Sequence, residues 1–108
     1  MKNKVLTLLG FASKAGKLQF GMAKSQESVR KEKSQLLICA NDVSQKSKKE
    51  IAFMAHNKDL NWVTLQGVTI EELSAAVGRK CGIVSVNDNG FAKAISKVLG
   101  GYANDQQI

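Results

Sequence analysis

The stretch from Ser13 to Ser25, SKAGKLQFGMAKS, places glycines, lysines and a closing Lys-Ser close together. It is similar to the phosphate loop of nucleotide-binding enzymes, Gly-x-x-x-x-Gly-Lys-[Ser/Thr]. Gly16 and Gly21 have the required separation, but Lys24 and the serine after it come two residues later than the pattern demands. The stretch is therefore either a defective nucleotide site or a different arrangement for binding phosphate.

The surroundings favour the second interpretation. A phosphate loop follows a buried strand, so that its amides surround the phosphate and the loop opens onto a helix. Gly16 instead follows a stretch with helical spacing of apolar residues, and Asp42, the nearest candidate for a magnesium ligand, is better explained as a helix cap. Gly21 precedes a second predicted helix with Lys24 in its first turn. The free amides and the lysine attract phosphate, and glycine leaves the approach open, although a plain strand-to-helix turn with solvated lysines remains the alternative.

A second loop, Gly78-Arg79-Lys80-Cys81-Gly82, lies between a predicted helix and a predicted strand. It is one residue longer than the Gly-x-x-Gly clamp of KH domains, which grips a nucleic-acid backbone. Arg79 can donate two hydrogen bonds to one phosphate or to a guanine edge, whereas Lys80 acts as a point charge. The alternative is a flexible surface turn.

The distribution of charge indicates a polyanionic partner. The chain has 108 residues and a formal net charge of +7. Residues 1–49 hold eleven Lys and Arg against three Asp and Glu, a net charge of +8, and residues 50–108 hold five against six. A basic half of this kind is typical of a nucleic-acid-binding face, although a solubilising surface has the same composition. The six aromatic residues do not alternate with the basic ones, so folded RNA is favoured over splayed single strands, and DNA remains open.

Other chemistry finds little support in the sequence. Cys39 and Cys81 form no Cys-x-x-Cys pair, and the single histidine, His56, is far from both, so we expect neither a metal site nor a catalytic nucleophile. No cofactor is predicted. No apolar run approaches the roughly 20 residues that cross a bilayer, and the amino terminus is a poor match to a secretory signal. We expect a cytoplasmic protein without membrane contact.

Alternating helices and short strands must position these residues. Thr69 and Glu72 have the spacing of a capping box, and Asp42 or Ser44 is placed to cap the helix before it. The expected strands cover 17–20, 35–40, 61–65 and 82–87. The expected helices cover 3–14, 22–32, a stretch around 51–55, a stretch from the capping box through Ala76 that stops at Gly78, and a last one that ends at Gly100-Gly101. The pattern predicts one three-layer α/β/α domain over residues 1–102, with a frayed tail over 103–108.

Over residues 3–100 the order of these motifs resembles the kink-turn-binding ribosomal proteins. This family includes the large-subunit proteins seven-Ae and thirty-e, and the chain is most similar to its bacterial YlxQ-like branch. The likeness rests on Ser13-Lys-Ala-Gly-Lys17, on Gly21 opening a helix, on Leu36-Leu-Ile-Cys-Ala-Asn-Asp42, and on Glu72-Leu before Gly78. It implies a three-layer sandwich around a mixed four-stranded sheet. It also implies binding to a kink-turn, an RNA helix bent sharply at a bulge beside tandem sheared G·A pairs.

In that family the helix at the position of Gly21 enters the RNA groove, and the loop before the last strand covers an extruded nucleotide. The resemblance therefore implies an RNA-binding set, which is Gly21, Met22, Ala23, Lys24, Lys31, Asn41, Asp42, Arg79, Lys80 and Cys81. Archaeal members read Gly-Ala-Asn-Glu at positions 21–24 and have a lysine in place of Glu27, so the side chains that contact the G·A guanines differ here.

The leading hypothesis is a non-catalytic, monomeric RNA-binding protein of the ribosome or its assembly. Phosphate contacts are expected from Lys14, Lys17, Lys24, Lys31, Arg79 and Lys80. Two other classes stay open. One is an enzyme acting on a small anion bound at Gly21, and the other is a module whose basic face meets an acidic protein.

Overall fold

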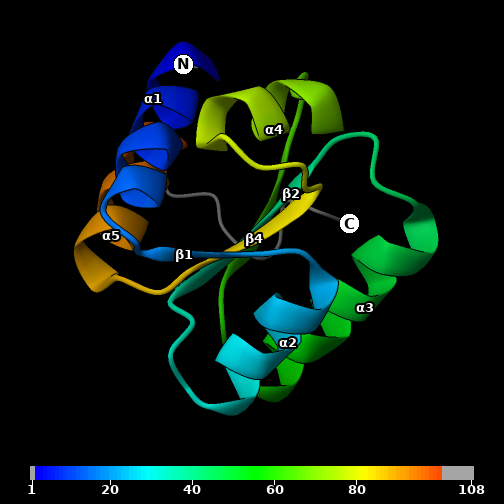
Figure 1. Ribbon diagram of the computed structural model, residues 1–108. Helices are drawn as coiled ribbons and strands as arrows, with labels where there is room; N and C mark the ends of the chain where they lie inside the picture. The colour runs from blue at the N-terminus through cyan, green and yellow to red at the C-terminus, as the bar shows by residue number, and fades with distance from the viewer. Residues whose placement is uncertain (1, 101–108) are drawn as a thin grey trace.

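A mixed four-stranded sheet forms the middle layer of the protein in a computed structural model that describes residues 2–100 (Figure 1). The strands lie in the order β1-β4-β2-β3. β4 is antiparallel to both β1 and β2, whereas β3 is parallel to β2. In chain order the strands are β1 (Leu18–Phe20), β2 (Leu36–Ala40), β3 (Trp62–Leu65) and β4 (Ile83–Val86).

Helices cover both faces of this sheet (Figure 1). On one face α1 packs against α4 and α5, and on the other α2 packs against α3. In chain order the helices are α1 (Lys2–Lys14), α2 (Met22–Arg30), α3 (Gln45–Asn57), α4 (Ile70–Val77) and α5 (Asn89–Val98). The predicted three-layer α/β/α sandwich with a mixed sheet is confirmed. The predicted domain end at 102 and the tail over 103–108 lie outside the described residues.

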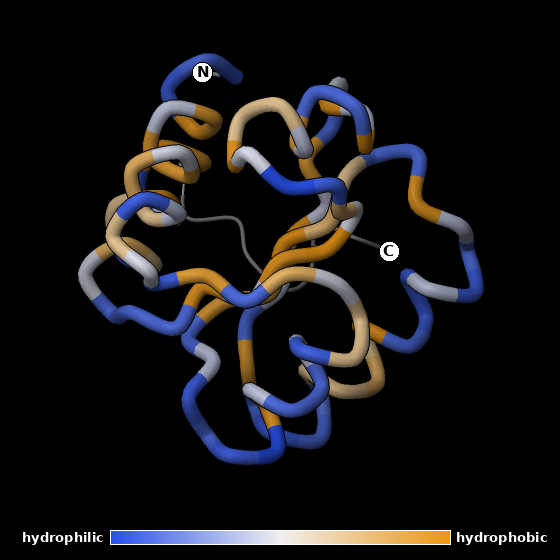
Figure 2. The backbone as a smooth tube through the Cα atoms, viewed as in Figure 1, coloured by the Kyte–Doolittle hydropathy of each residue, from blue (hydrophilic) through white to orange (hydrophobic). Residues whose placement is uncertain are grey.

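The central strand β2 shows why the sequence between 35 and 40 is continuously apolar. Leu36 and Ile38 point into a core with α1, α4 and α5, while Leu37 and Cys39 point into a second core with α2 and α3. All four are buried because helices cover both faces of the sheet. Hydrophobic residues accordingly follow the central strands, and the connection from α2 to β2 is hydrophilic (Figure 2).

Side chains fix the helix starts that the sequence had indicated. Thr69 and Glu72 form the predicted capping box at α4. Of the two candidate caps for α3, Ser44 is the one used, because its side chain accepts a hydrogen bond from the Ser47 amide over 3.2 Å. Asp42 instead accepts from the backbone amide of Ile70 over 2.7 Å and so stabilises the start of α4, far along the chain.

The connection from α1 to β1 excludes a nucleotide-type phosphate loop. Gly16 lies directly after a helix, with φ of 74°, and not after a buried strand. Its neighbour Lys17 donates its amide back to the carbonyl of Ala12 over 2.9 Å, which is the hydrogen bond of a glycine-terminated helix end. Gly16 therefore ends α1. Among residues 2–100, no helix has the length and apolar character needed to span a membrane.

Candidate nucleic-acid interface

Gly21 is the hinge between β1 and α2. Its φ and ψ of 87° and 169° belong to a region that residues with a side chain rarely adopt, so the backbone here requires glycine. Its amide donates to the carbonyl of Ile83 over 2.8 Å, which ties the hinge to β4. Apart from its two chain neighbours, no residue between 2 and 100 would come within 4 Å of a Cβ atom at Gly21. The space in front of the hinge is thus open to a ligand.

The loop 78–82 lies beside this hinge. The guanidinium of Arg79 is stacked over the ring of Phe20, 5.0 Å from its centroid, and Phe20 directly precedes Gly21. Such a cation–π contact orients the arginine without consuming its hydrogen-bond donors. Arg79 and Lys80 are both exposed. The structure therefore brings together the two segments that the sequence had indicated separately, although about 60 residues separate them in the chain.

Asn41 and Asp42 follow β2 at the same end of the sheet as Gly21 and the loop 78–82. The residue before them, Ala40, donates its amide to the carbonyl of Gly82 over 2.9 Å, so the end of β2 adjoins the Arg79 loop. The carbonyl of Asn41 accepts from Nζ of Lys48 over 2.7 Å, while one carboxylate oxygen of Asp42 is engaged at α4. Both residues are exposed, but some of their hydrogen-bond acceptors are already used within the protein.

Two members of the predicted RNA-binding set face the protein interior. Met22 is half-buried and packs on the core between the sheet and α3. Cys81 is buried, and the hydroxyl of Ser74 bonds to its backbone amide and carbonyl over 3.0 and 3.1 Å. Ala23, by contrast, is exposed beside Lys24 on the outer face of α2.

Further along α2, two lysines share one carboxylate. Glu27 lies 3.8 Å from Nζ of Lys24 and 3.0 Å from Nζ of Lys31. The hydrogen bond from Lys31, aided by both lysine charges, holds the pKa of Glu27 below its usual range. The carboxylate is therefore ionised at neutral pH and partly neutralises the two lysines.

Lys14 and Lys17 lie at the opposite end of β1 from Gly21. Both are exposed, and the carbonyl of Lys17 accepts from the amide of Asn87 over 2.8 Å. The predicted residues thus form two groups, one around Gly21 and the Arg79 loop and one around the far end of α2. The outer face of α2, about 13 Å long for nine residues, connects them.

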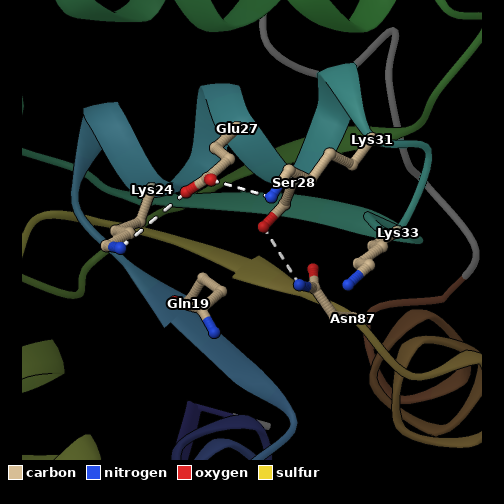
Figure 3. A pocket seen from close by; sticks show the side chains of 7 residues that line it. All are labelled: Gln19, Lys24, Glu27, Ser28, Lys31, Lys33 and Asn87. Carbon is tan, nitrogen blue, oxygen red and sulfur yellow. Dashed lines mark hydrogen bonds and ion pairs between the residues drawn. The ribbon is translucent and has the colours of Figure 1, made fainter.

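A polar pocket that extends along α2, from Lys24 in its first turn to Lys33 beyond its end, contains residues that the sequence did not single out (Figure 3). Its volume is about 150 Å³, and it lies between α2, β1 and the end of β4. The lining residues are Gln19, Lys24, Glu27, Ser28, Lys31, Lys33 and Asn87. Two features of the sequence could have indicated it: Gln19 is the one polar residue of β1, and Asn87 is the polar residue that ends the strand predicted over 82–87. Hereafter this is called the α2 pocket.

The geometry offers little for metal or thiol chemistry. Within residues 2–100, no three His, Cys, Asp or Glu side chains come close enough to hold a metal ion together. Cys39 is fully buried and Cys81 nearly so, and burial raises the pKa of both thiols. A raised pKa disfavours the thiolate, which is the nucleophilic form.

Known proteins of similar sequence and fold agree with this description. The chain is 28% identical over 100 residues to the RNA-binding protein YlxQ of Enterococcus faecium, covering 93% of this chain and 95% of that protein. A protein of unknown function from Bacillus halodurans C has the same fold, with a TM-score of 0.84 and 22% identity over 90% of this chain and 97% of its own. The Giardia lamblia 15.5kD RNA binding protein has a TM-score of 0.73 and 14% identity, with 92% and 84% covered.

The family model that matches the sequence covers residues 3–96, nearly the span over which the motif order had suggested a resemblance. The Gly21 hinge, the Arg79 loop and the α2 pocket all fall inside that span. The chain belongs to the ribosomal protein L7Ae/L30e/S12e/Gadd45 family.

Proposed function

We propose that this protein is a non-catalytic RNA-binding protein, ribosomal or ribosome-associated, that recognises structured RNA of the kink-turn type. The amino-terminal end of α2 at Gly21 approaches the RNA backbone at the bend, and the Arg79 loop contacts the nucleotides beside it. The protein acts as a monomer in the cytoplasm and needs no cofactor.

One observation carries the proposal, which is the joining of the Gly21 hinge and the Arg79 loop into a single open surface. The amide of Gly21 is bonded to Ile83, and Arg79 stacks on Phe20, so both segments are held in place before any ligand arrives. In the described part of the chain no atom beyond the two neighbouring residues comes within 4 Å of a Cβ built at Gly21, and the adjoining loop holds the exposed cations Arg79 and Lys80. A preformed surface of this kind suits a rigid, bent phosphate backbone, because little ordering is needed on binding.

The relatives support the RNA part of the proposal. Two of the similar proteins are named as RNA-binding, one through sequence and one through fold. The charge distribution supports it independently, because the basic half, residues 1–49, contains β1 and α2. Phosphate contacts are assigned to the exposed cations of the two groups, which are Lys14, Lys17, Lys24, Lys31, Arg79 and Lys80.

The first experiment titrates the protein with a short kink-turn RNA and with a matched duplex in which Watson–Crick pairs replace the sheared G·A pairs. We expect the matched duplex to bind at least about tenfold more weakly, which corresponds to about 1.4 kcal/mol. Equal affinity for the two RNAs would overturn kink-turn recognition and leave general RNA binding standing. No measurable binding of either RNA would overturn both.

Lys80→Gln and Lys97→Gln form a matched pair for the second experiment. Both lysines are exposed, but Lys80 lies in the loop beside Gly21, whereas Lys97 lies on α5 in the other helical layer. Loss of one phosphate contact should lower the slope of log K against log salt by about 0.7 to 0.9. We expect this change for Lys80→Gln and none for Lys97→Gln. The same change in both variants would show that overall charge, and not this surface, governs binding.

A further inference from the structure

The α2 pocket has a rigid polar floor. The hydroxyl of Ser85, which is fully buried, is bonded to the hydroxyl of Ser34 over 2.7 Å and donates to Oδ1 of Asn87 over 2.6 Å. Nδ2 of Asn87 then donates to Oγ of Ser28 over 3.0 Å (Figure 3). These four side chains link β4, α2 and the connection after α2. A network of this kind holds its surface groups in fixed positions before any ligand binds.

The floor and walls present unused hydrogen-bond donors. An amide side chain has two N–H groups, and only one of those of Asn87 is used by Ser28. The hydroxyl proton of Ser28 and the side-chain amide of Gln19 have no acceptor within residues 2–100, and both residues line the pocket. Lys33 adds an ammonium that forms no ion pair or side-chain hydrogen bond in the same part of the chain. The pocket is therefore built to receive acceptor atoms.

The charges in the pocket select an anion. Lys24, Lys31 and Lys33 carry three positive charges, and Glu27 carries one negative charge, so the lining has a net charge of +2. The carboxylate of Glu27 already bridges two of these lysines, at 3.8 and 3.0 Å. It does so with the charge and the oxygen acceptors that a phosphate group would bring. The volume of the pocket, about 150 Å³, has room for one such group together with bound water.

We propose that the α2 pocket receives a single phosphate group of the bound RNA and that the Glu27 carboxylate occupies the place of this phosphate in the free protein. The proposal rests on the RNA-binding function above. It adds a binding site for one phosphate, hereafter the phosphate seat, at which the Glu27 carboxylate competes with the RNA. When RNA binds, the phosphate takes over Lys31 and Lys24, and it gains Lys33 and the donors of the floor.

The exchange is energetically easy because the ion pairs are exposed. Lys24, Glu27 and Lys31 keep 65%, 38% and 49% of their side-chain surface accessible, so solvent screens their attraction. Exposed pairs of this kind are weak, so Glu27 should lower RNA affinity by only about two- to fivefold. Glu27 thus tunes affinity and does not block binding.

The experiment measures the affinity of kink-turn RNA for four single variants at several salt concentrations. Glu27→Gln should raise affinity about two- to fivefold, because it removes the competitor. Lys33→Gln should lower affinity to a similar extent and reduce the salt slope by about 0.7 to 0.9. Glu71→Gln and Lys97→Gln make the same charge changes at exposed sites on α4 and α5, in the other helical layer, and should leave both quantities unchanged.

Side-chain amide signals in NMR spectra locate the phosphate. We expect the signals of Gln19 and Asn87 to shift when kink-turn RNA is added to the parent protein and to shift much less for Lys33→Gln. Inorganic phosphate serves as the second probe. If it moves these signals and RNA does not, the pocket takes free phosphate, and the assignment to RNA is overturned.

The outcomes separate this proposal from the one on kink-turn recognition. If Glu27→Gln does not raise affinity, or if Lys33→Gln changes nothing while the kink-turn preference persists, the phosphate seat is wrong and the function stands. If the parent binds the kink-turn RNA and the Watson–Crick duplex equally well while the two variants act as expected, the phosphate seat stands and kink-turn recognition fails. Equal effects of Glu27→Gln and Glu71→Gln would reduce the role of Glu27 to its contribution to net charge.

Discussion

Replacing Gly21 by alanine isolates the contribution of backbone conformation at the hinge. The φ and ψ of 87° and 169° lie in a region that is accessible almost only to glycine, and placing another residue there requires about 1–3 kcal/mol. Steric collision adds no cost within residues 2–100, because an added Cβ would meet no atom there within 4 Å beyond its chain neighbours. Alanine has the same backbone amide, so we expect the hydrogen bond to the carbonyl of Ile83 to be kept in the variant. We therefore expect the free energy of unfolding to fall by about 1–3 kcal/mol.

The single tryptophan makes this loss easy to measure. Trp62 is buried in β3 with 5% of its surface exposed, so its fluorescence reports global unfolding in urea. The midpoint should fall while the slope m stays constant, since the surface exposed on unfolding does not change. For a domain of this size, each kcal/mol lost should lower the melting temperature by about 4–8 °C.

Gly78 provides the matched control. Its φ and ψ of 77° and 18° are left-handed helical, a conformation that asparagine also adopts. We therefore compare Gly21→Asn with Gly78→Asn, and we expect the free energy of unfolding to fall more for Gly21→Asn. Equal losses at the two sites, or an alanine variant at Gly21 as stable as the parent, would refute the argument that the hinge conformation requires glycine.

Three further predictions concern the interior and the surface. Ser85→Ala removes a partner from both Ser34 and Asn87, and it should lower the free energy of unfolding by about 1–3 kcal/mol in urea titrations; no loss would mean that water replaces the hydroxyl. The pKa of Glu72 is held below its usual range, first by a hydrogen bond from Lys2 and then by the backbone at the start of α4, so its stabilising effect is present above about pH 4.3 and is lost as the pH falls through the lower folded value. The melting temperature of the parent should thus exceed that of Glu72→Gln at pH 7, and the two should become equal in acid. A difference in melting temperature that does not change with pH would contradict this role of Glu72. Cys39, with no exposed surface and a raised pKa, should resist thiol reagents in the native protein and react only at the rate of unfolding, and rapid labelling under native conditions would show that the core opens locally.

Local patterns predicted the elements well because each rests on a short-range rule. The capping box of Thr69 and Glu72 needs only three residues of spacing, and the apolar run before Asn41 needs only a strand covered on both faces. The three-layer arrangement follows from the alternation of these elements. The structure contains each of these predicted features, and the cap of α3 is Ser44 and not Asp42.

The site was predictable only in part, since its assembly depends on long-range pairing. Both Gly21 and the Arg79 loop could be found in the sequence, but their contact depends on the register of β1 against β4. Cys81 stands between a lysine and a glycine in a basic loop, and only the fold shows that its side chain packs into the core while the Ser74 hydroxyl binds its backbone. Lys33 had no motif of its own and gains significance only through the pocket that the fold creates.

The pairing of the first strand with the last also governs how the protein can fold during synthesis. Within residues 2–100, β1 pairs with β4 alone, and α1 packs against α4, which is made just before β4, and against α5, which is made just after it. A nascent chain that ends before residue 83 therefore exposes apolar side chains such as Val5, Leu9 and Leu18, which are buried in the finished protein. Contacts of such long sequence separation slow folding, so the domain completes its core only after α5 has left the ribosome. The segment synthesised first is thus among the last to become stable.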